Sequence, residues 1–150
     1  MNAPKRVLPP IYFLISLIVM VGLNFFFPLI KIVQHPYSYI GGVLIVIGTI
    51  MNLWASGYFF KVNTTIKPFQ RSTHLVTVGL YQYTRNPMYL GGIFMLLGVA
   101  LLLGSLTPFL VIPVFMWLIQ EHFIKVEESE LQETFKDEYL EYKKQVRRWI

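Results

Sequence analysis

Two short segments carry the residues that could do chemistry. The first is Arg85-Asn86-Pro87-Met88-Tyr89, in which an arginine and an amide precede a proline. A guanidinium in such a place can hold an anion, such as a carboxylate, through two parallel hydrogen bonds. The alternative is an interfacial arginine that snorkels to lipid phosphate while Pro87 opens a helix. The residue types alone leave both interpretations open.

The second segment is the acidic pair Glu127-Glu128. A stripe of residues at three- and four-residue steps predicts one amphipathic helix that lies on the membrane or against other helices. Glu128 is the charged member of this stripe. A carboxylate on a buried face needs a partner, and Arg85 or a cationic ligand would serve. Glu127 lies off the stripe and is expected to be solvated. The stripe consists of Ile124, Glu128, Leu131, Phe135, Tyr139, Tyr142, Val146 and Trp149.

Several other kinds of site have no support in the sequence. The chain has no cysteine, which excludes disulfides, thiolate nucleophiles and cysteine metal sites. It also lacks a dinucleotide-binding glycine pattern, a phosphate-binding loop and the zinc-protease helix motif. A metal site could be drawn from Glu121, His122 and Glu128, but their spacing does not single it out. The sequence therefore predicts no metal.

The elements that must position these segments are typical of a membrane protein. Of 150 residues, 55% are hydrophobic and 14% are charged, whereas a soluble domain carries about 25% charged residues. Long stretches without charge predict membrane-spanning helices. The predicted fold is an all-α integral membrane protein with one domain over residues 1–150. Its parts are spans at 8–30, 37–60, 88–103 and 106–120, a turn at Gly104-Ser105, a connector at 61–87 and a cytoplasmic tail helix within 121–150.

The distribution of basic residues predicts the orientation of the chain. With four spans, twelve of the thirteen lysines and arginines lie on one side of the membrane and Lys31 lies on the other. Basic loops face the cytoplasm, so both termini and the connector are predicted to be cytoplasmic. The same distribution explains the net charge of +5 by topology and lipid headgroups. No nucleic-acid partner is predicted, because no module that reads bases is visible.

The two segments together resemble the signature of the isoprenylcysteine carboxyl methyltransferase family, which related phospholipid methyltransferases share loosely. The segment from His74 to Tyr81 and the motif that begins at Arg85 carry the resemblance. The acidic pair and the aromatic run of the tail extend it over about residues 67–148. This chain departs from the usual pattern at three positions: Asn86 replaces His, Leu80 replaces Pro, and Lys136 replaces Gly.

The resemblance implies an S-adenosylmethionine-dependent methyltransferase embedded in the membrane. With this cofactor, Arg85 can bind the carboxylate of either the cofactor or the acceptor, and Glu127 and Glu128 can accept hydrogen bonds from the ammonium or the ribose diol. The resemblance implies that His74 and the backbone near Leu75 to Gly79 bracket the adenine. Arg85 and Glu128 are the expected catalytic residues. The expected cofactor-binding residues are His74, Leu75, Val76, Gly79, Tyr81, Arg85, Asn86, Pro87, Tyr89, Glu127 and Glu128.

The expected acceptor bears a lipid and enters sideways from the bilayer with its head at the cytoplasmic interface. A prenylated cysteine carboxylate is the first candidate, and a phospholipid amine is the alternative. Two rival functions are a lipid-modifying reductase, which would bind a nicotinamide, and a non-enzymatic membrane adaptor, which would not bind the methyl donor. The apolar side chains expected to line the lipid route are Phe94, Met95, Leu96, Phe115, Met116 and Trp117.

Overall fold

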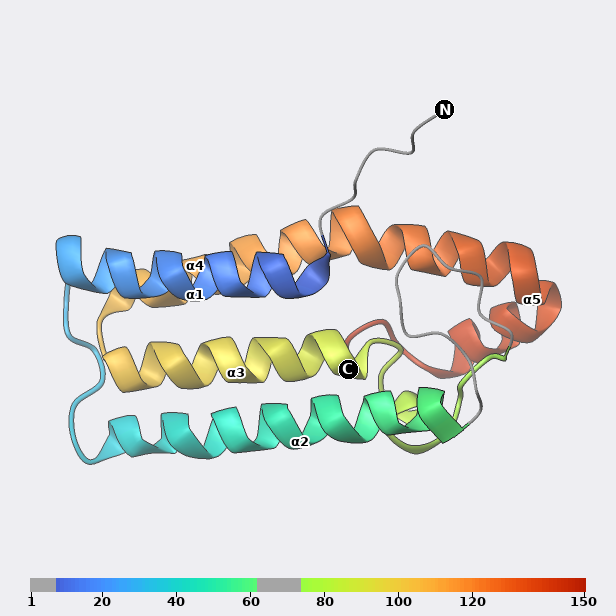
Figure 1. Cartoon of the computed structure of the whole chain (residues 1–150), viewed down its shortest axis with the longest axis horizontal. Helices are drawn as coiled ribbons and strands as arrows, with labels where there is room; N and C mark the ends of the chain where they lie inside the picture. The colour runs from blue at the N-terminus through green and yellow to red at the C-terminus, as the bar shows by residue number, and fades with distance from the viewer. Residues whose placement is uncertain (1–7, 62–73) are drawn as a thin grey trace.

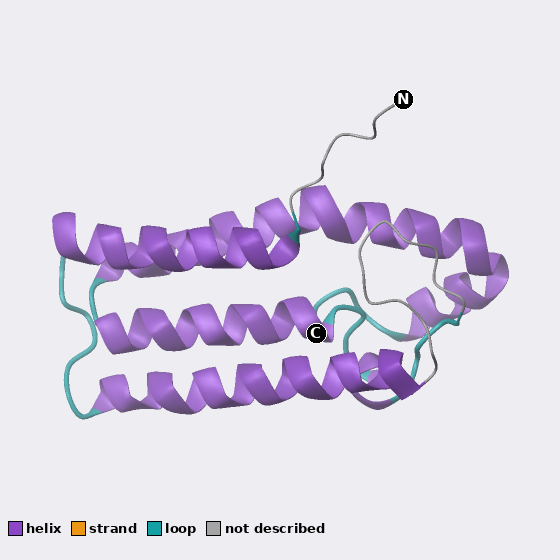
Figure 2. Ribbon diagram, viewed as in Figure 1, coloured by secondary structure: helices purple, strands orange, loops and turns teal. Residues whose placement is uncertain are grey.

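A computed structural model of the chain describes residues 8–61 and 74–150. The predicted connector falls partly outside these residues, as do Lys5 and Arg6. Regular structure in the described part is helical, joined by loops and by short 3-10 and π-helical turns (Figure 2). The α-helices are α1 (Pro9–Phe26), α2 (Ile40–Lys61), α3 (Pro87–Leu103), α4 (Leu106–Ile119) and α5 (Lys125–Gln145).

Helices α1 to α4 run alongside one another, with α3 between α2 and the pair formed by α1 and α4 (Figure 1). The loop after α1 and the turn after α3 lie at one end of this bundle. The start of α3, the base of α5 and the C-terminus lie at the other end. Both segments that could do chemistry are therefore at the same end, as the predicted topology requires.

Three helical stretches are long and apolar enough to cross a membrane: Pro9–Phe26, Tyr37–Tyr58 and Leu106–Gln145. The last is 40 residues long; its apolar part is α4, and the charged α5 extends beyond the bundle. Helix α3 is also apolar, but its 17 residues rise only about 26 Å. Large apolar side chains face outward, among them Ile18 at 72% exposure. The protein is an all-helical integral membrane protein, while the number of four spans stays a prediction.

Glycines bring α2 and α3 into backbone contact. A Cβ atom on Gly41 would overlap the carbonyl oxygen of Gly98, and a Cβ on Gly48 would overlap that of Gly91. Small residues permit such an approach in lipid, where close packing replaces the hydrophobic effect as the source of helix association. The contact fixes the start of α3, and with it the segment that begins at Arg85, against α2.

Helix α1 ends at Phe26 rather than at the predicted Ile30. Pro28 cannot donate a backbone hydrogen bond and disfavours a helical conformation of the residue before it. The chain after Pro28 pairs instead with the turn that follows α3, where the Leu106 N–H donates to the Ile30 oxygen at 2.9 Å. Gly104 ends α3 with a φ of 77°, a conformation that glycine adopts without a steric cost. The predicted turn at this position is confirmed.

The tail differs from the predicted single helix. Helix α4 passes through a π-helical turn at Gln120–Ile124 directly into α5, so the helix does not end at Gln120. At Lys136 the backbone adopts φ 46° and ψ −116°, and α5 reverses direction there (Figure 1). The predicted stripe is therefore divided between two arms of α5 that fold back on each other. Lys136 is the position where the resembled family carries glycine, which takes such a conformation freely.

Candidate functional site

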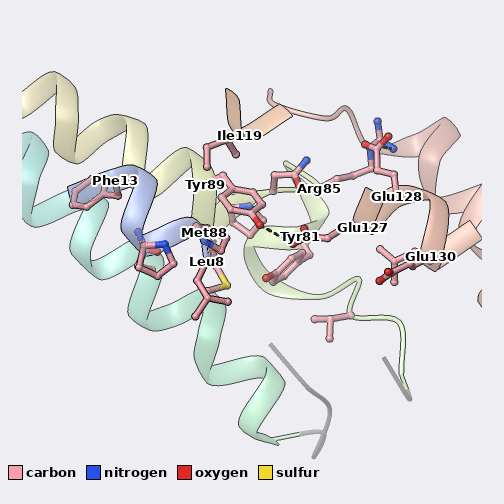
Figure 3. Close-up of a pocket in the computed structure, with 18 of the residues that line it drawn as sticks. Leu8, Phe13, Tyr81, Arg85, Met88, Tyr89, Ile119, Glu127, Glu128 and Glu130 are labelled. Carbon is pink, nitrogen blue, oxygen red and sulfur yellow. Dashed lines mark hydrogen bonds and ion pairs between the residues drawn. The ribbon is translucent and has the colours of Figure 1, made fainter. Parts of the chain in front are cut away.

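A cavity of about 640 Å³ lies at the end of the bundle where α5 begins. Helices α1 to α4, the segment before α3 and both arms of α5 contribute to its lining. One end of the cavity is charged and contains Glu127 and Glu130, whereas the other is apolar and contains Phe13. In the close-up, Phe13 lies at the apolar end, Glu130 at the charged end and Tyr89 between them (Figure 3).

The structure brings together most of the residues that the sequence assigned to a site. Gly79 is the exception. It adopts a φ of 64°, and the ring of Tyr58 occupies the place where a Cβ atom would be. Gly79 therefore shapes the segment before α3 and does not line the cavity. The assigned residues that do line it are His74, Leu75, Val76, Tyr81, Arg85, Asn86, Pro87, Tyr89, Glu127 and Glu128.

Glu128 holds two arginines at the charged end. Arg148 makes two parallel hydrogen bonds to its carboxylate, Nε to Oε1 at 3.0 Å and Nη2 to Oε2 at 2.8 Å. Arg85 Nη1 lies 3.1 Å from Oε1, and the side chains of Arg85 and Glu128 are only 9% and 11% exposed. The predicted partner Arg85 is thus confirmed. Arg148 was not anticipated, because a straight tail helix would have carried it away from Glu128, whereas the reversal at Lys136 returns it.

The group formed by Glu128, Arg85 and Arg148 carries one more positive charge than negative, and one of its hydrogen-bond donors is unpaired. Arg85 Nη1 also donates to the Tyr139 hydroxyl at 3.2 Å. Arg85 Nε is buried and has no hydrogen-bond partner in the described part of the chain. A buried donor without a partner costs about 1–3 kcal/mol. The arrangement is therefore suited to an anionic ligand that accepts a hydrogen bond from this N–H.

Glu127 is the second acidic group of the cavity. Its Oε1 accepts a hydrogen bond from the Tyr89 hydroxyl at 2.7 Å (Figure 3). Burial raises the pKa of Glu127 from 4.5 to about 7, against the effect of the Tyr89 hydrogen bond and with help from Glu130 and Glu128. The expectation that Glu127 is solvated was wrong, because α3 supplies a partner that no tail pattern reveals. A cationic ligand would favour the ionised form of this carboxyl group.

The wall beside Arg85 is made by the residues that follow α5. The Arg85 backbone N–H donates to the Arg147 oxygen at 3.0 Å. The Asn86 amide and the Thr84 hydroxyl donate to the Arg148 oxygen at 2.9 and 3.2 Å. Asn86 thus binds the segment that follows α5. Its amide makes this hydrogen bond without the titrating ring of the histidine that the resembled family carries here.

The apolar arm of the cavity enters the bundle along α3. From Pro87 to Met95 it follows the helix for about 12 Å of rise. Of the expected apolar walls, Met95 and Phe115 line it. The other four point elsewhere, because successive helical residues face different directions; Leu96 is fully buried in the core, and Trp117 is 60% exposed on the outer surface. These four are Phe94, Leu96, Met116 and Trp117.

Two polar residues of α2, Thr49 and Asn52, also line the cavity. Neither residue stood out in the sequence, where residues 37–60 were predicted as an apolar span. The signal that could have found Asn52 is its side-chain amide within a stretch free of charge, since polar residues inside a membrane are costly and often functional.

Comparison with known proteins gives a consistent result. Residues 37–138 match the phospholipid methyltransferase family. The protein-S-isoprenylcysteine O-methyltransferase of Saccharomyces cerevisiae is 35% identical over 132 residues, which cover 82% of this chain and 54% of the yeast protein. Protein-S-isoprenylcysteine O-methyltransferase B of Arabidopsis thaliana is 30% identical over 136 residues, covering 89% of this chain and 68% of the plant protein.

A solved structure of a eukaryotic intramembrane Ras methyltransferase, isoprenylcysteine carboxyl methyltransferase, resembles the whole chain. The TM-score is 0.66 at 25% sequence identity, and the match covers 100% of this chain and 53% of that one. The chain thus spans about half the length of the yeast relative and of the solved structure.

Proposed function

The chain belongs to the phospholipid methyltransferase family, and we propose that it is a membrane methyltransferase that transfers a methyl group from S-adenosylmethionine to a lipid-bearing acceptor. The favoured acceptor is a prenylated cysteine carboxylate, because the yeast and plant relatives are protein-S-isoprenylcysteine O-methyltransferases. The proposal includes a single membrane domain over residues 1–150 whose site faces the cytoplasm.

One observation carries this proposal: a single cavity joins a charged end to an apolar arm that runs into the bundle. A water-soluble, charged cofactor fits the first part, and the chain of a lipid fits the second. The junction between them lies near Tyr89, which reaches from α3 to Glu127. A methyl donor and a lipid head group would meet there.

The charged end fits S-adenosylmethionine in charge. The whole cavity, charged end and apolar arm together, has a volume of about 640 Å³, within the usual range of about 300–1,000 Å³ for small-molecule sites. When bound, this cofactor supplies a methyl group on a cationic sulfonium. Glu127 would accept a hydrogen bond from the ammonium or a ribose hydroxyl of the cofactor, while the unpaired Arg85 Nε would donate to the carboxylate of the acceptor. His74 lines the same cavity, and the resemblance implies that it contacts the adenine.

Glu128 would act through Arg85 rather than by touching a ligand. Its carboxylate oxygens are already bonded to Arg148 and Arg85, so its role is to hold the Arg85 guanidinium in place. Methylation of a carboxylate requires no general base, and alignment of donor and acceptor supplies most of the rate. Arg85 is accordingly the residue expected to touch a reacting carboxylate.

The acceptor would enter from the bilayer between α1 and α2, which lie on opposite sides of α3 (Figure 1). The rim of the cavity includes Leu8, which immediately precedes α1, and Leu53 on α2; they are 49% and 69% exposed. Both are apolar, so a lipid chain can pass them without leaving a hydrocarbon environment. Its head would then reach Arg85 at the cytoplasmic interface.

A phospholipid amine is a second candidate acceptor, and Glu127 is the observation that favours it. An amine must lose a proton before it attacks a methyl group. A carboxyl group with a pKa of about 7 can accept that proton near neutral pH. Acceptors that share one apolar chain but carry either a carboxylate or an amine would separate the two candidates.

The proposed function is tested by methyl transfer from isotopically labelled S-adenosylmethionine to carboxylate acceptors with apolar chains of different length. We expect kcat/KM, referred to the concentration of acceptor free in water, to rise about fourfold for each methylene group that reaches the arm. Gly92→Leu should narrow the arm and lower kcat/KM for long acceptors. Gly42→Leu is the control, because nothing lies within 4 Å of a Cβ at Gly42.

Equal kcat/KM for short and long acceptors would contradict the membrane route. Failure to bind S-adenosylmethionine in a titration of the detergent-purified protein would contradict the methyltransferase assignment itself.

A further inference from the structure

Helix α2 carries an asparagine, Asn52, whose hydrogen-bonding capacity is only partly used by its own helix. The Thr49 hydroxyl donates to the Ile45 oxygen at 2.8 Å, and the Ser56 hydroxyl donates to the Leu53 oxygen at 3.1 Å. Hydroxyl groups in membrane helices are commonly satisfied in this way. Asn52 differs, because it has two N–H donors and a carbonyl acceptor and uses one donor, Nδ2, on the Gly48 oxygen at 3.0 Å.

The oxygen of Asn52 has no hydrogen-bond donor among the described residues. Asn52 lines the cavity together with Leu53 and Met95. An amide oxygen without a donor is costly in a medium that supplies no water. A polar residue inside a membrane therefore indicates a ligand or a helix partner.

The position of Asn52 defines which part of a ligand it could contact. Its amide nitrogen is the atom nearest to a Cβ built on Gly91, so Asn52 lies beside that residue of α3. Gly91 is two residues beyond Tyr89 and therefore about 3 Å further along the helix axis. Asn52 thus lies just past the junction of the charged end and the apolar arm. At this depth a bound lipid passes from its polar head to its apolar chain, and we call this part of the acceptor the neck.

We propose that Asn52 determines acceptor specificity by accepting, through Oδ1, a hydrogen bond from an N–H or O–H group in the neck of the acceptor. This inference rests on the proposed function and adds to it a chemical feature of the substrate: a donor group that lies between the methylated head and the apolar chain. An acceptor that lacks the donor would leave the Asn52 oxygen unpaired in the bound state.

The test uses two matched pairs of acceptors that share one carboxylate head and one apolar chain. In the first pair the neck contains a secondary amide or its N-methyl derivative, and in the second it contains an alcohol or its methyl ether. Binding is measured without methyl donor by displacement of a fluorescent lipid analogue from the purified protein, and kcat/KM is measured separately. We expect the wild-type protein to prefer the donor-bearing member of at least one pair about tenfold.

Asn52→Leu and Asn52→Ala should reduce this preference to within about twofold. The dissociation constant of S-adenosylmethionine should stay unchanged in both variants. An unchanged cofactor affinity also shows that the site has folded. Asn24→Leu is the matched control. Asn24 is also an amide in an apolar helix, but its Oδ1 accepts a hydrogen bond from Ser105 at 2.6 Å, at the opposite end of the bundle. The Asn24→Leu variant should retain the full preference for the donor-bearing acceptor.

The outcomes separate this inference from the proposed function. No preference within either pair in the wild-type protein, or a preference that persists in both Asn52 variants, would overturn the role of Asn52. So would a loss of cofactor affinity in those variants with the preference intact. Preferential binding that depends on Asn52 but is not followed by methyl transfer would support the recognition site and contradict the methyltransferase proposal.

Discussion

At the scale of single residues, two adjacent carboxyl groups face the same cavity but have different partners. Glu128 is held by two arginines. Glu127 instead binds a tyrosine hydroxyl and has the acidic residues Glu130 and Glu128 nearby. The difference predicts different responses to pH and to substitution, which the following two experiments measure.

Glu127 should make the stability of the empty protein depend on pH. Its pKa of about 7 in the folded state lies above the ordinary value of 4.5, so the folded state binds more protons between these values. The free energy of unfolding should therefore fall as the pH rises from about 4.5 to about 7, by a few kcal/mol at most. Glu127→Gln should remove this slope in denaturant titrations in detergent. Glu133→Gln, at an exposed position of the same helix, should keep it, and an unchanged slope in Glu127→Gln would contradict the prediction.

The contacts of Glu128 predict strong coupling with Arg148. Glu128→Gln leaves two guanidinium groups without their counter-charge, and removal of one partner of a buried pair costs about 3–5 kcal/mol. Arg148→Met in the same chain should recover part of that loss, because only Arg85 then lacks a partner. A double-mutant cycle of unfolding free energies measures the coupling. Strictly additive losses would show that the two parallel hydrogen bonds contribute little.

The sequence allowed prediction of the site residues whose signal is local. Arg85 precedes a helix-opening proline, and Glu128 interrupts an apolar stripe, so both could be singled out and paired. Arg148 could not, because its contact with Glu128 depends on a reversal of the chain between them. The burial of Glu127 also depends on another helix, since Tyr89 supplies the contact. Long-range partners of this kind leave no periodic pattern.

At the scale of secondary-structure elements, the reversal of α5 depends on a lysine in a conformation that favours glycine. The φ of 46° at Lys136 costs an L-residue about 1–3 kcal/mol. Lys136→Gly should therefore increase the free energy of unfolding by about 1 kcal/mol, after the entropy of the more flexible unfolded chain is deducted.

Lys143→Gly is the matched control for this prediction. Lys143 is exposed in the straight part of the second arm, where the same change should lower stability by about 1 kcal/mol. Denaturant titrations measure both variants, and a loss of stability in both would show that Lys136 is not strained.

The contact between α2 and α3 yields a second prediction from adjacent residues. Gly41→Ala places a Cβ against the carbonyl oxygen of Gly98, which must move away. The expected loss of stability is about 1–3 kcal/mol, the usual cost of overpacking. Gly42→Ala meets open space and should be neutral or slightly stabilising. Thermal unfolding in detergent compares the two, and equal melting temperatures would contradict the close helix contact.

Element boundaries were predictable where proline or glycine determines them. Pro87 and Gly104 bound α3 as expected, because one cannot donate within a helix and the other adopts a positive φ. The end of α1 was placed too late, because charge-free residues after Pro28 continue the apolar stretch without continuing the helix. The reversal at Lys136 had no signal in the residue itself, since lysine is an ordinary helical residue; the only indication was the glycine that the resembled family carries at this position.

At the scale of the whole molecule, the proposed orientation makes a direct prediction. The chain lacks cysteine, so single cysteines can report which side of the membrane a position faces. Gln34 is exposed at the end of the bundle opposite the site, and Tyr83 is 74% exposed near the site. In sealed vesicles whose cytoplasmic side faces inward, an impermeant maleimide should label Gln34→Cys, whereas Tyr83→Cys should react only after permeabilisation. Labelling of Tyr83→Cys in sealed vesicles would contradict the proposed orientation.

The chain that returns beside Arg85 has a consequence for biosynthesis. Apolar helices can enter the bilayer in order as the ribosome delivers them, since N-terminal parts fold first. The oxygen of Arg148, however, meets Asn86 and Thr84 across 62 and 64 residues of sequence. Until those later residues emerge, one wall of the cavity is missing and Glu128 lacks its second arginine. A nascent chain with all its helices inserted therefore still lacks this wall, which can form only after Arg148 has been synthesised and has reached the start of α3.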